Sequence, residues 1–205
     1  MSIPLLAEER ASARWSSLCP EEKRARLLRA AGEVFARNGL DAPMPAIAAA
    51  AGAGIGSVYR QFPSKRELLA ALVIERLEDC RLGAEAALAS DESAWTALTG
   101  LLWALAERQA TDDVLGEAMA TVSEHPAVQD ELGAATLALE ALLAAARVEG
   151  RLRGDATALD LRLLFTATRA AGQLESGAWR RMLELGIDAL QRRDGAEPGA
   201  SGGAC

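Results

Sequence analysis

The feature that most constrains this chain is the recurrence of apolar residues at helical spacing in one segment after another. Residues 20–38, for example, place Leu27, Ala31 and Val34 on one face, at steps of four and three. No run of residues alternates between apolar and polar as a half-buried strand does. Half of the chain is apolar and only 4% is aromatic, and the abundant alanine and leucine favour helices. We therefore expect an all-α protein with a substantial core.

Glycine and proline mark the ends of the expected elements. A short second helix should begin at Asp41 or Ala42 and end at Gly52, and Ser64 should cap a longer fourth helix. Longer helices follow from residue 91, which gives about nine in all. The expected domains are a poorly ordered extension at 1–18, a small domain built on three helices at 19–82, a larger helical body at 83–193 and a disordered tail at 194–205.

Charge is distributed unevenly along the chain. The net charge of −7 does not fit a protein that coats nucleic acid over its whole surface. Residues 21–66, however, carry eight basic and four acidic side chains, a local charge of +4, which leaves −11 for the remainder. A basic domain on an acidic body indicates one module that faces a polyanion.

The cysteines and the apolar segments bear on where the protein works. Cys19, Cys80 and Cys205 have neither the spacing of metal ligands nor that of a disulfide framework, which favours a reducing compartment. The first 22 residues do not have the pattern of a signal peptide. No apolar stretch approaches the roughly 20 residues needed to cross a bilayer. We expect a soluble, cytoplasmic protein without a membrane partner.

One stretch, AGAGIGSVYRQFPSK at 51–65, carries the most distinctive chemistry. Its alternate glycines, Gly52, Gly54 and Gly56, suggest a loop that binds the phosphates of either a nucleotide cofactor or DNA. A dinucleotide fingerprint needs the spacing G-x-G-x-x-G after a strand, whereas here G-x-G-x-G follows the helical run AIAAAA. The P-loop pattern G-x-x-x-x-G-K-[ST] is absent. The cofactor interpretation is therefore disfavoured, and no cofactor is expected.

Two short helices joined by a tight turn fit a helix-turn-helix over 43–62, whose second helix enters the major groove. A helix about 10–12 Å across must fit a groove about 12 Å wide, so the small residues Gly56 and Ser57 would let the backbone approach DNA closely. Val58 and Phe62 are spaced to point inward. The alternative is that the glycines mark only a loose loop, which leaves the aromatic and basic residues that follow unexplained.

The strings VFARNG, IAAAAG and GSVYRQFPSKRELL, taken together, resemble the tetracycline-repressor (TetR) family of bacterial regulators over about residues 21–82. Residues 56–62 (GSVYRQF) match the order usual in the family at this point. That order is a small residue such as Gly, then Thr or Ser, then Leu, then Tyr, then two polar residues and finally Phe. The departures are Gly54, where many members have serine or threonine, and Pro43 and Pro45, where threonine and charged residues are common. The resemblance implies a small DNA-binding domain at 19–82 followed by a helical body that binds ligand and dimerises.

The resemblance also implies roles for individual residues. Tyr59, Ser57 and Lys65 correspond to phosphate ligands, and the dipole of the fourth helix would help Lys65. The positions of Ile55, Arg60 and Gln61 face or flank base edges, and each polar group has solvated surface as its alternative role. The implied DNA-binding set is Ile55, Gly56, Ser57, Tyr59, Arg60, Gln61 and Lys65.

The second half of the chain offers no catalytic or metal-binding constellation. It has one histidine, His125, beside Pro126 at an expected helix break, and no cluster of histidine and carboxylates at metal spacing. A cap or surface position suits that histidine as well as a ligand pocket does. We expect neither an enzyme nor a metal site.

We expect the body to bind a small molecule and to pair with a second copy. Core packing within the single chain is the alternative for both sets of residues. The candidate ligand-binding residues are Trp95, Leu98, Leu102, Trp103, Met119, His125 and Phe165. The candidate dimer-interface residues are Leu163, Ala167, Ala171, Leu174, Trp179, Met182, Leu183, Gly186, Ile187 and Leu190.

The resulting hypothesis is a ligand-responsive transcriptional regulator. A homodimer would bind a near-palindromic double-stranded DNA operator with its recognition helices about 34–36 Å apart, and would act most simply as a repressor. A small apolar or amphipathic effector would release it, although activation fits the sequence too. The alternative is an all-helical small-molecule-binding or protein-interaction module whose helix-turn-helix does not bind DNA.

Overall fold

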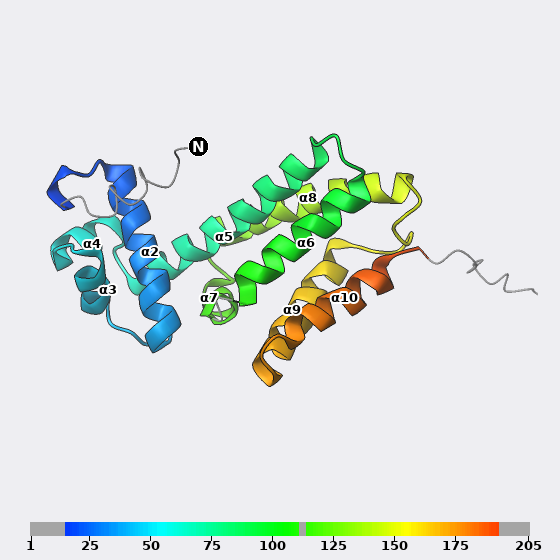
Figure 1. The fold of residues 1–205 in the computed structure, drawn as a ribbon. Coiled ribbons are helices and arrows are strands. Elements are labelled where there is room, and N and C mark those ends of the chain that lie inside the picture. The colour runs from blue at the N-terminus through cyan, green and yellow to red at the C-terminus, as the bar shows by residue number, and fades with distance from the viewer. Residues whose placement is uncertain (1–14, 111–113, 193–205) are drawn as a thin grey trace, which may run out of the picture. The chain divides into compact units, whose positions relative to one another are not determined.

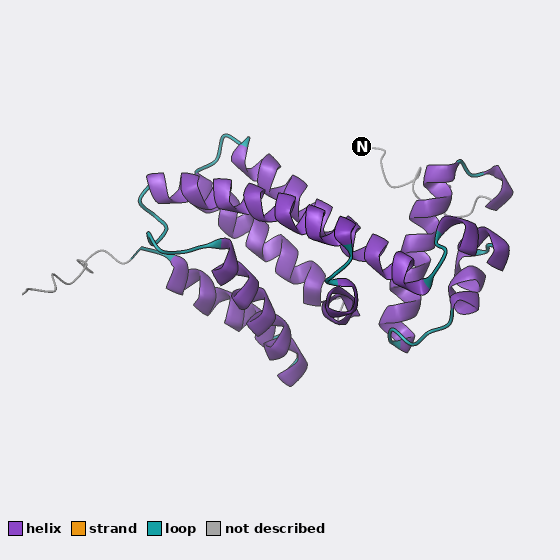
Figure 2. Cartoon of the chain, turned by 180° about the vertical axis from the view of Figure 1, so that it is seen from behind, coloured by secondary structure: helices purple, strands orange, loops and turns teal. Residues whose placement is uncertain are grey.

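The computed structural model describes residues 15–110 and 114–192. Over these residues it contains nine α-helices and one short 3₁₀ helix, joined by loops and without strands, which confirms the all-α prediction (Figures 1 and 2). The disordered tail expected at 194–205 lies outside the described residues. So does the poorly ordered extension expected at 1–18, apart from its last four residues, of which Trp15–Ser17 form the 3₁₀ helix η1.

The described residues divide into two compact units, which we call unit 1 and unit 2. Unit 1 holds residues 15–79 and 114–133, and unit 2 holds residues 80–110 and 134–192. Helices α5 and α8 each contribute residues to both units. The helices are α2 (Pro20–Asn38), α3 (Met44–Ala51), α4 (Ile55–Gln61), α5 (Lys65–Leu88), α6 (Ala94–Ala110), α7 (Val114–Val122), α8 (Pro126–Val148), α9 (Ala158–Leu174) and α10 (Ala178–Leu190).

The first helices of unit 1 begin and end close to the positions indicated by the sequence. Cys19 caps α2, since its Sγ accepts the Glu22 N–H while the Glu22 carboxylate accepts the Cys19 N–H. Helix α3 begins at Met44, two to three residues later than expected, because Pro43 is extended and serves as its N-terminal cap. As predicted, Ser64 caps α5, its Oγ accepting the Glu67 N–H at 3.2 Å.

The core of unit 1 joins the short helices to α2 and to the first half of α5. Helix α2 packs against α3 and α7, and α3 packs against α4. Val58 and Phe62 are buried in this core, as their spacing predicted. Val122 and Val128, from the end of α7 and the start of α8, belong to the same core. The helix-turn-helix therefore folds together with a segment that lies some sixty residues further along the chain.

Unit 2 is a set of packed helices with its own core. Helices α9 and α10 run antiparallel side by side, and both contact α6 (Figures 1 and 2). Gly186 allows the close approach of α10 to α9, since a Cβ at this position would lie only 2.1 Å from Leu164 Cδ1. The largest fully buried side chains of this core are Leu98, Leu102, Leu142, Leu143, Leu152, Leu161 and Leu183.

Distant carboxylates cap two helices of unit 2. The Glu149 carboxylate accepts the N–H groups of Ala94 and Trp95 at 2.6 and 3.1 Å, which satisfies two free donors at the start of α6. The Glu140 Oε1 accepts the Ala158 N–H at 2.6 Å at the start of α9. The carboxyl-terminal part of α8 and the residue that follows it thus fix where both helices begin.

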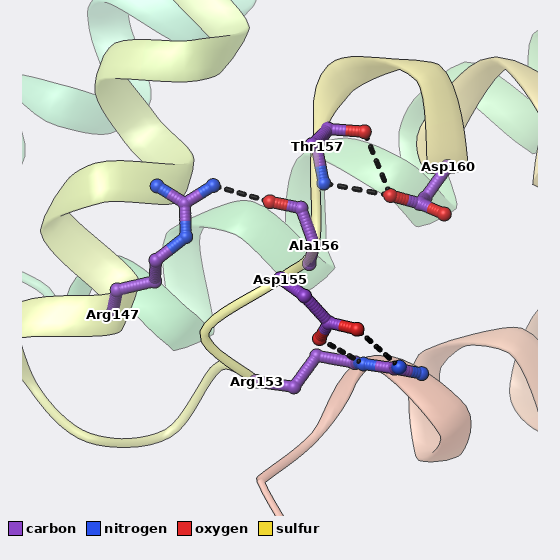
Figure 3. Close-up of polar contacts among 6 residues, drawn as sticks. All are labelled: Arg147, Arg153, Asp155, Ala156, Thr157 and Asp160. Atoms are coloured by element: carbon purple, nitrogen blue, oxygen red, sulfur yellow. Dashed lines mark hydrogen bonds and ion pairs between the residues drawn. The ribbon is translucent and has the colours of Figure 1, made fainter.

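The loop between α8 and α9 is held by three polar contacts (Figure 3). Arg153 binds both oxygens of Asp155, at 2.6 and 2.7 Å, and this contact lowers the pKa of that carboxyl. The Asp160 Oδ2 accepts the N–H and the hydroxyl of Thr157, at 2.7 and 2.8 Å. Arg147 donates to the carbonyl of Ala156. These contacts set the direction in which the chain enters α9.

Membrane-spanning helices and metal-ligand clusters are both absent from residues 15–110 and 114–192. None of the helices there combines the length and apolarity that crossing a bilayer requires. No group of three or more histidine, cysteine and carboxylate side chains in these ranges could hold a metal ion.

Candidate nucleic-acid interface

A tight turn at Gly52 joins α3 to α4. Gly52 has a φ of 65° and a ψ of 31°, in the left-handed region that glycine tolerates. The Gly52 N–H donates to the carbonyl of Ala49 and the Ala53 N–H to that of Ala48, at 3.1 and 2.9 Å. This pair of bonds is a Schellman motif, which satisfies the last carbonyls of α3 and redirects the chain. The glycine at 52 therefore serves the turn of a helix-turn-helix.

Helix α4 separates a buried face from an exposed one. Val58 is fully buried and Phe62, its C-terminal cap, is 2% exposed, which fixes the helix to the core of unit 1. On the opposite side, Ile55 and Tyr59 lie one turn apart and are 42% and 47% exposed. Both are large apolar or aromatic side chains that lie outside the core. Gly56 and Arg60 are also exposed, whereas Ser57 and Gln61 are half-buried.

The exposed face of α4 thus carries side chains that can bind the phosphates and the base edges of DNA. A tyrosine hydroxyl can bind phosphate, and an arginine can bind either phosphate or the guanine edge. The alternate glycines leave the backbone at Gly56 uncovered, with no heavy atom within 4 Å of a Cβ built there. A nucleic-acid backbone can therefore approach this side of the helix closely.

Lys65 begins α5, three residues after the cap of α4. Its side chain is half-buried, and its Nζ lies 5.7 Å from the centroid of the Phe35 ring, within the range of a cation–π contact. Phe35 itself is fully buried. This ring limits the positions available to the ammonium group.

Two acidic side chains of the adjoining helices α2 and α5 have partners of their own. Glu33 pairs with Arg37 at 3.6 Å, and Glu67 pairs with His125 at 3.4 Å. Among the residues that the structure describes, neither Arg60 nor Lys65 has a carboxylate partner. These two positive charges therefore stay without a carboxylate contact, which suits binding to a polyanion.

The residues predicted to bind ligand fall in both units. Trp95, Leu98 and Leu102 lie in the core of unit 2, where Trp103 and Phe165 pack against it. Met119 packs against the core of unit 1. His125, also in unit 1, directs its Nε2 towards Glu67, and its buried Nδ1 has no hydrogen-bond partner within the described ranges. The ligand-binding role of all seven stays a prediction.

Some of the residues predicted at the dimer interface are buried in the core of unit 2. Leu183 is fully buried, and Trp179 and Leu190 are each 7% exposed, packed within the single chain. Five further members of the set are half-buried: Ala167, Ala171, Met182, Gly186 and Ile187. Leu163 and Leu174, both on α9, are 59% and 88% exposed. Within the predicted set, these two leucines are therefore the large apolar side chains most available to another molecule.

Sequence reasoning missed one residue beside this surface and two that shape unit 2. Arg24 of α2 lies over Phe62 at the end of α4, with 5.0 Å from its guanidinium carbon to the ring centroid. Glu140 and Glu149 cap helices that begin at Ala158 and Ala94. These contacts join residues 18 to 55 positions apart, and no local spacing in the sequence indicates them.

Comparison with known proteins agrees with this geometry. A family model described as bacterial regulatory proteins, tetR family, matches residues 27–72, which include both helices of the helix-turn-helix. No curated protein matches the sequence. Together with the all-α fold, this match indicates a helix-turn-helix transcriptional regulator with a helical second unit. Residues 27–72 thus form the domain that characterises the TetR family of bacterial regulators, and the fold of the chain is the one found in regulators of that family.

Solved structures of TetR regulators are similar along most of the chain. The regulator SCO0520 from Streptomyces coelicolor is 26% identical with a TM-score of 0.63, over 82% of this chain and 98% of that one. A TetR regulator from Mycobacterium vanbaalenii is 28% identical with a TM-score of 0.61, over 92% of this chain and 100% of the other. FadR from Bacillus subtilis, solved with stearoyl-CoA, shares the fold at 19% identity, with a TM-score of 0.61 and coverage of 81% and 98%.

Proposed function

We propose that this TetR-family protein is a cytoplasmic repressor that binds a near-palindromic DNA operator as a homodimer and is released by a small apolar or amphipathic effector. The observation that carries the proposal is the exposure of Ile55, Tyr59 and Arg60 on α4, opposite the buried Val58 and Phe62. In this role Tyr59, Ser57 and Lys65 bind phosphate. Ile55, Arg60 and Gln61 face base edges, where arginine suits guanine and glutamine suits adenine.

An apolar stripe on α9 supports the homodimer. Leu159, Leu163 and Leu174 are 59%, 59% and 88% exposed. Leu159 and Leu163 are one turn apart, and Leu174 follows three turns later on the same side of the helix. A row of exposed leucines is costly in water and is suited to burial against the same row of a second copy. A dimer supplies the two α4 helices that a near-palindromic operator needs, one for each half-site.

The composition of unit 2 supports an apolar effector. Trp103 and Trp179 meet edge to face with ring centroids 6.1 Å apart, in surroundings of leucine and alanine. FadR, which has the same fold, was solved with stearoyl-CoA. Helices α5 and α8 supply residues to both units, so a change in their positions on effector binding bears on the helix-turn-helix. Typical coupling of about 1–3 kcal/mol would loosen DNA binding roughly 5- to 150-fold.

The decisive experiment is a DNA-binding assay with the full-length protein. Selection from a random duplex pool, together with a mobility shift on the region upstream of its own coding sequence, should recover a near-palindromic site. Binding should weaken steeply with salt, because phosphate contacts release counterions. Stearoyl-CoA serves as the first effector probe. Failure to select any sequence, or a flat plot of log affinity against log salt, would count against the proposal.

The competing function is a ligand-binding or protein-interaction module whose helix-turn-helix does not bind DNA. Arg60 and Lys65 have no carboxylate partner in the described structure, and Tyr59 is exposed. These features argue against the alternative, because a module that does not bind DNA does not explain them. A protein that binds stearoyl-CoA but no duplex in the same assays would favour this alternative. Activation instead of repression is distinguished by the direction in which the regulated transcript changes when the protein is removed.

A further inference from the structure

Arg24, which lies on α2 outside the helix-turn-helix, is held beside the end of α4. Its guanidinium carbon is 5.0 Å from the centroid of the Phe62 ring, within the roughly 6 Å over which an aromatic face attracts a cation. Phe62 is 2% exposed and is the C-terminal cap of α4, whereas Arg24 is exposed. A buried ring therefore fixes an exposed cation next to the last turn of the candidate recognition helix.

The hydrogen-bonding capacity of Arg24 is unused. Within residues 15–110 and 114–192, no carboxylate or carbonyl accepts a hydrogen bond from its guanidinium. The nearest acids on the helix are directed to the start of α2. Glu22 accepts the Cys19 N–H at 3.0 Å, and the pKa of Glu21 is lowered by hydrogen bonds from its own backbone and from the Cys19 side chain. The positive charge of Arg24 is thus left for a ligand outside the chain.

The arrangement of Arg24 parallels that of Lys65. Both cations lie over a buried phenylalanine, both are without an acidic partner in the described structure, and Phe62 and Lys65 are separated by only two residues. A guanidinium presents a planar fork of N–H donors that matches phosphate oxygens in pairs. Stacking on an aromatic face leaves the edge of that fork free.

We propose that Arg24 is a further DNA-contacting residue, which binds a backbone phosphate beside the end of α4. The inference rests on the proposed DNA-binding function and extends its contact surface from the helix-turn-helix to α2. Because a phosphate contact carries no sequence information, Arg24 contributes affinity and salt dependence without specificity.

The test is the salt dependence of DNA binding by Arg24→Met, measured by fluorescence anisotropy with the full-length protein. Two probes are used: a duplex selected by the wild-type protein and a scrambled duplex of the same length. Methionine keeps an unbranched apolar stem on the Phe62 ring but removes the charge. The slope of log affinity against log salt should become shallower by about 0.9 per protomer on both probes. Arg24→Lys, which keeps the charge, should retain most of the slope.

Arg29→Met is the matched control. Arg29 is an exposed arginine of the same helix without a partner among the described residues, and it lies about 140° around the helix from Arg24. Its replacement should leave the slope unchanged. An equal fall in both variants would overturn the inference, because it would reflect only the net charge of α2.

Two further measurements distinguish phosphate binding by Arg24 from a purely structural role, and failure of this inference from failure of the proposed function. Thermal unfolding of Arg24→Met should match that of the wild type, and a lowered midpoint with an unchanged salt slope would assign Arg24 to stability alone. Wild-type protein that binds neither duplex would overturn the proposed function and this inference with it. Wild-type binding combined with an unchanged slope in Arg24→Met would overturn the inference alone.

Discussion

Gly52 is the residue on which the geometry of the helix-turn-helix depends most directly. Its φ of 65° lies in the left-handed region, and a Cβ there would come within 3.3 Å of Arg26 Nη2. Gly52→Ala should lower the free energy of unfolding by about 1–2 kcal/mol, the cost of a side chain in that conformation. Urea denaturation followed by circular dichroism measures this change.

Gly32 provides the opposite case within the same unit. It lies inside α2, has no positive φ, and has no heavy atom within 4 Å of the position that a Cβ would take. Gly32→Ala should therefore stabilise the protein by about 0.5–1 kcal/mol, because alanine loses less conformational freedom in a helix. If Gly52→Ala were as stable as the wild type or more stable, as Gly32→Ala is expected to be, the assigned role of the Gly52 turn would be wrong.

The residues proposed to face DNA should divide into two classes when they are replaced. Tyr59→Phe removes a hydroxyl assigned to phosphate, so it should weaken binding to selected and scrambled duplexes by similar factors. Arg60→Ala removes a group assigned to base edges, so it should cost about 1–3 kcal/mol on the selected duplex and relax preference at particular base pairs. Anisotropy on duplexes with single base-pair changes measures both effects. Loss of sequence preference in Tyr59→Phe, with none in Arg60→Ala, would reverse the assignments.

At the residue scale, the sequence predicted what depends on local spacing. Val58 and Phe62 were expected inside because they lie one turn apart, and both are buried. Gly52 was expected to end the preceding helix, and it does. Arg24 was not assigned a role, because its position over the Phe62 ring brings together two residues that lie far apart in the sequence. A contact of this kind leaves no periodic signal.

At the element scale, the start of α9 should make stability depend on pH. The Asp160 carboxylate accepts hydrogen bonds from the hydroxyl and the N–H of Thr157, and these lower its pKa. A carboxyl whose pKa is lower in the folded state stabilises the fold above its unfolded pKa, and this contribution is lost as the pH falls below about 4. The Asp160→Asn variant imitates the protonated form. Its thermal midpoint should lie below that of the wild type at neutral pH and approach it in acid.

Asp188→Asn serves as the control for the pH experiment. Asp188 is an exposed carboxylate of α10 without a partner in the described part of the chain. Its replacement should give a difference from the wild type that is small at neutral pH. A midpoint gap for Asp160→Asn that persisted unchanged into acid would show that the carboxylate charge does not stabilise α9.

The ends of the helices show how far element boundaries follow from the sequence. Ser64 was recognised as the cap of α5 because the capping side chain is adjacent to its helix. The start of α3 was placed too early, at Asp41 or Ala42, because the structure keeps Pro43 extended and begins the helix at Met44. The cap of α6 was not foreseen, since Glu149 reaches it from 55 residues away.

At the scale of the whole molecule, the sequence indicated the all-α class and the family, but long-range packing decides the units. The predicted body ran without interruption over 83–193. In the structure, however, residues 114–133 join the core of unit 1 through Val122 and Val128. Both valines are ordinary apolar positions of their helices, so their spacing cannot reveal which core receives them. The predicted functional domains stay a proposal beside this structural division.

The homodimer is the remaining prediction at this scale, and Leu163 is the residue that tests it best. Leu163 is 59% exposed within the apolar stripe on α9, so Leu163→Glu should be tolerated by the fold of the single chain. Across a two-fold interface, the change would bring two carboxylates into apolar surroundings. The cost of desolvating them amounts to several kcal/mol, and every ~1.4 kcal/mol corresponds to about tenfold in the dissociation constant.

Sedimentation velocity and DNA anisotropy should therefore change together in Leu163→Glu. The variant should sediment as a monomer, and its affinity for the selected duplex should approach that for the scrambled one, because each half-site is then bound independently. Leu137→Glu is the matched control, since Leu137 is 74% exposed on α8 of the same unit and lies outside the stripe. If Leu163→Glu remained dimeric while Leu137→Glu dissociated, the interface would lie on α8, and the symmetry relating the two α4 helices would have to be derived from that face.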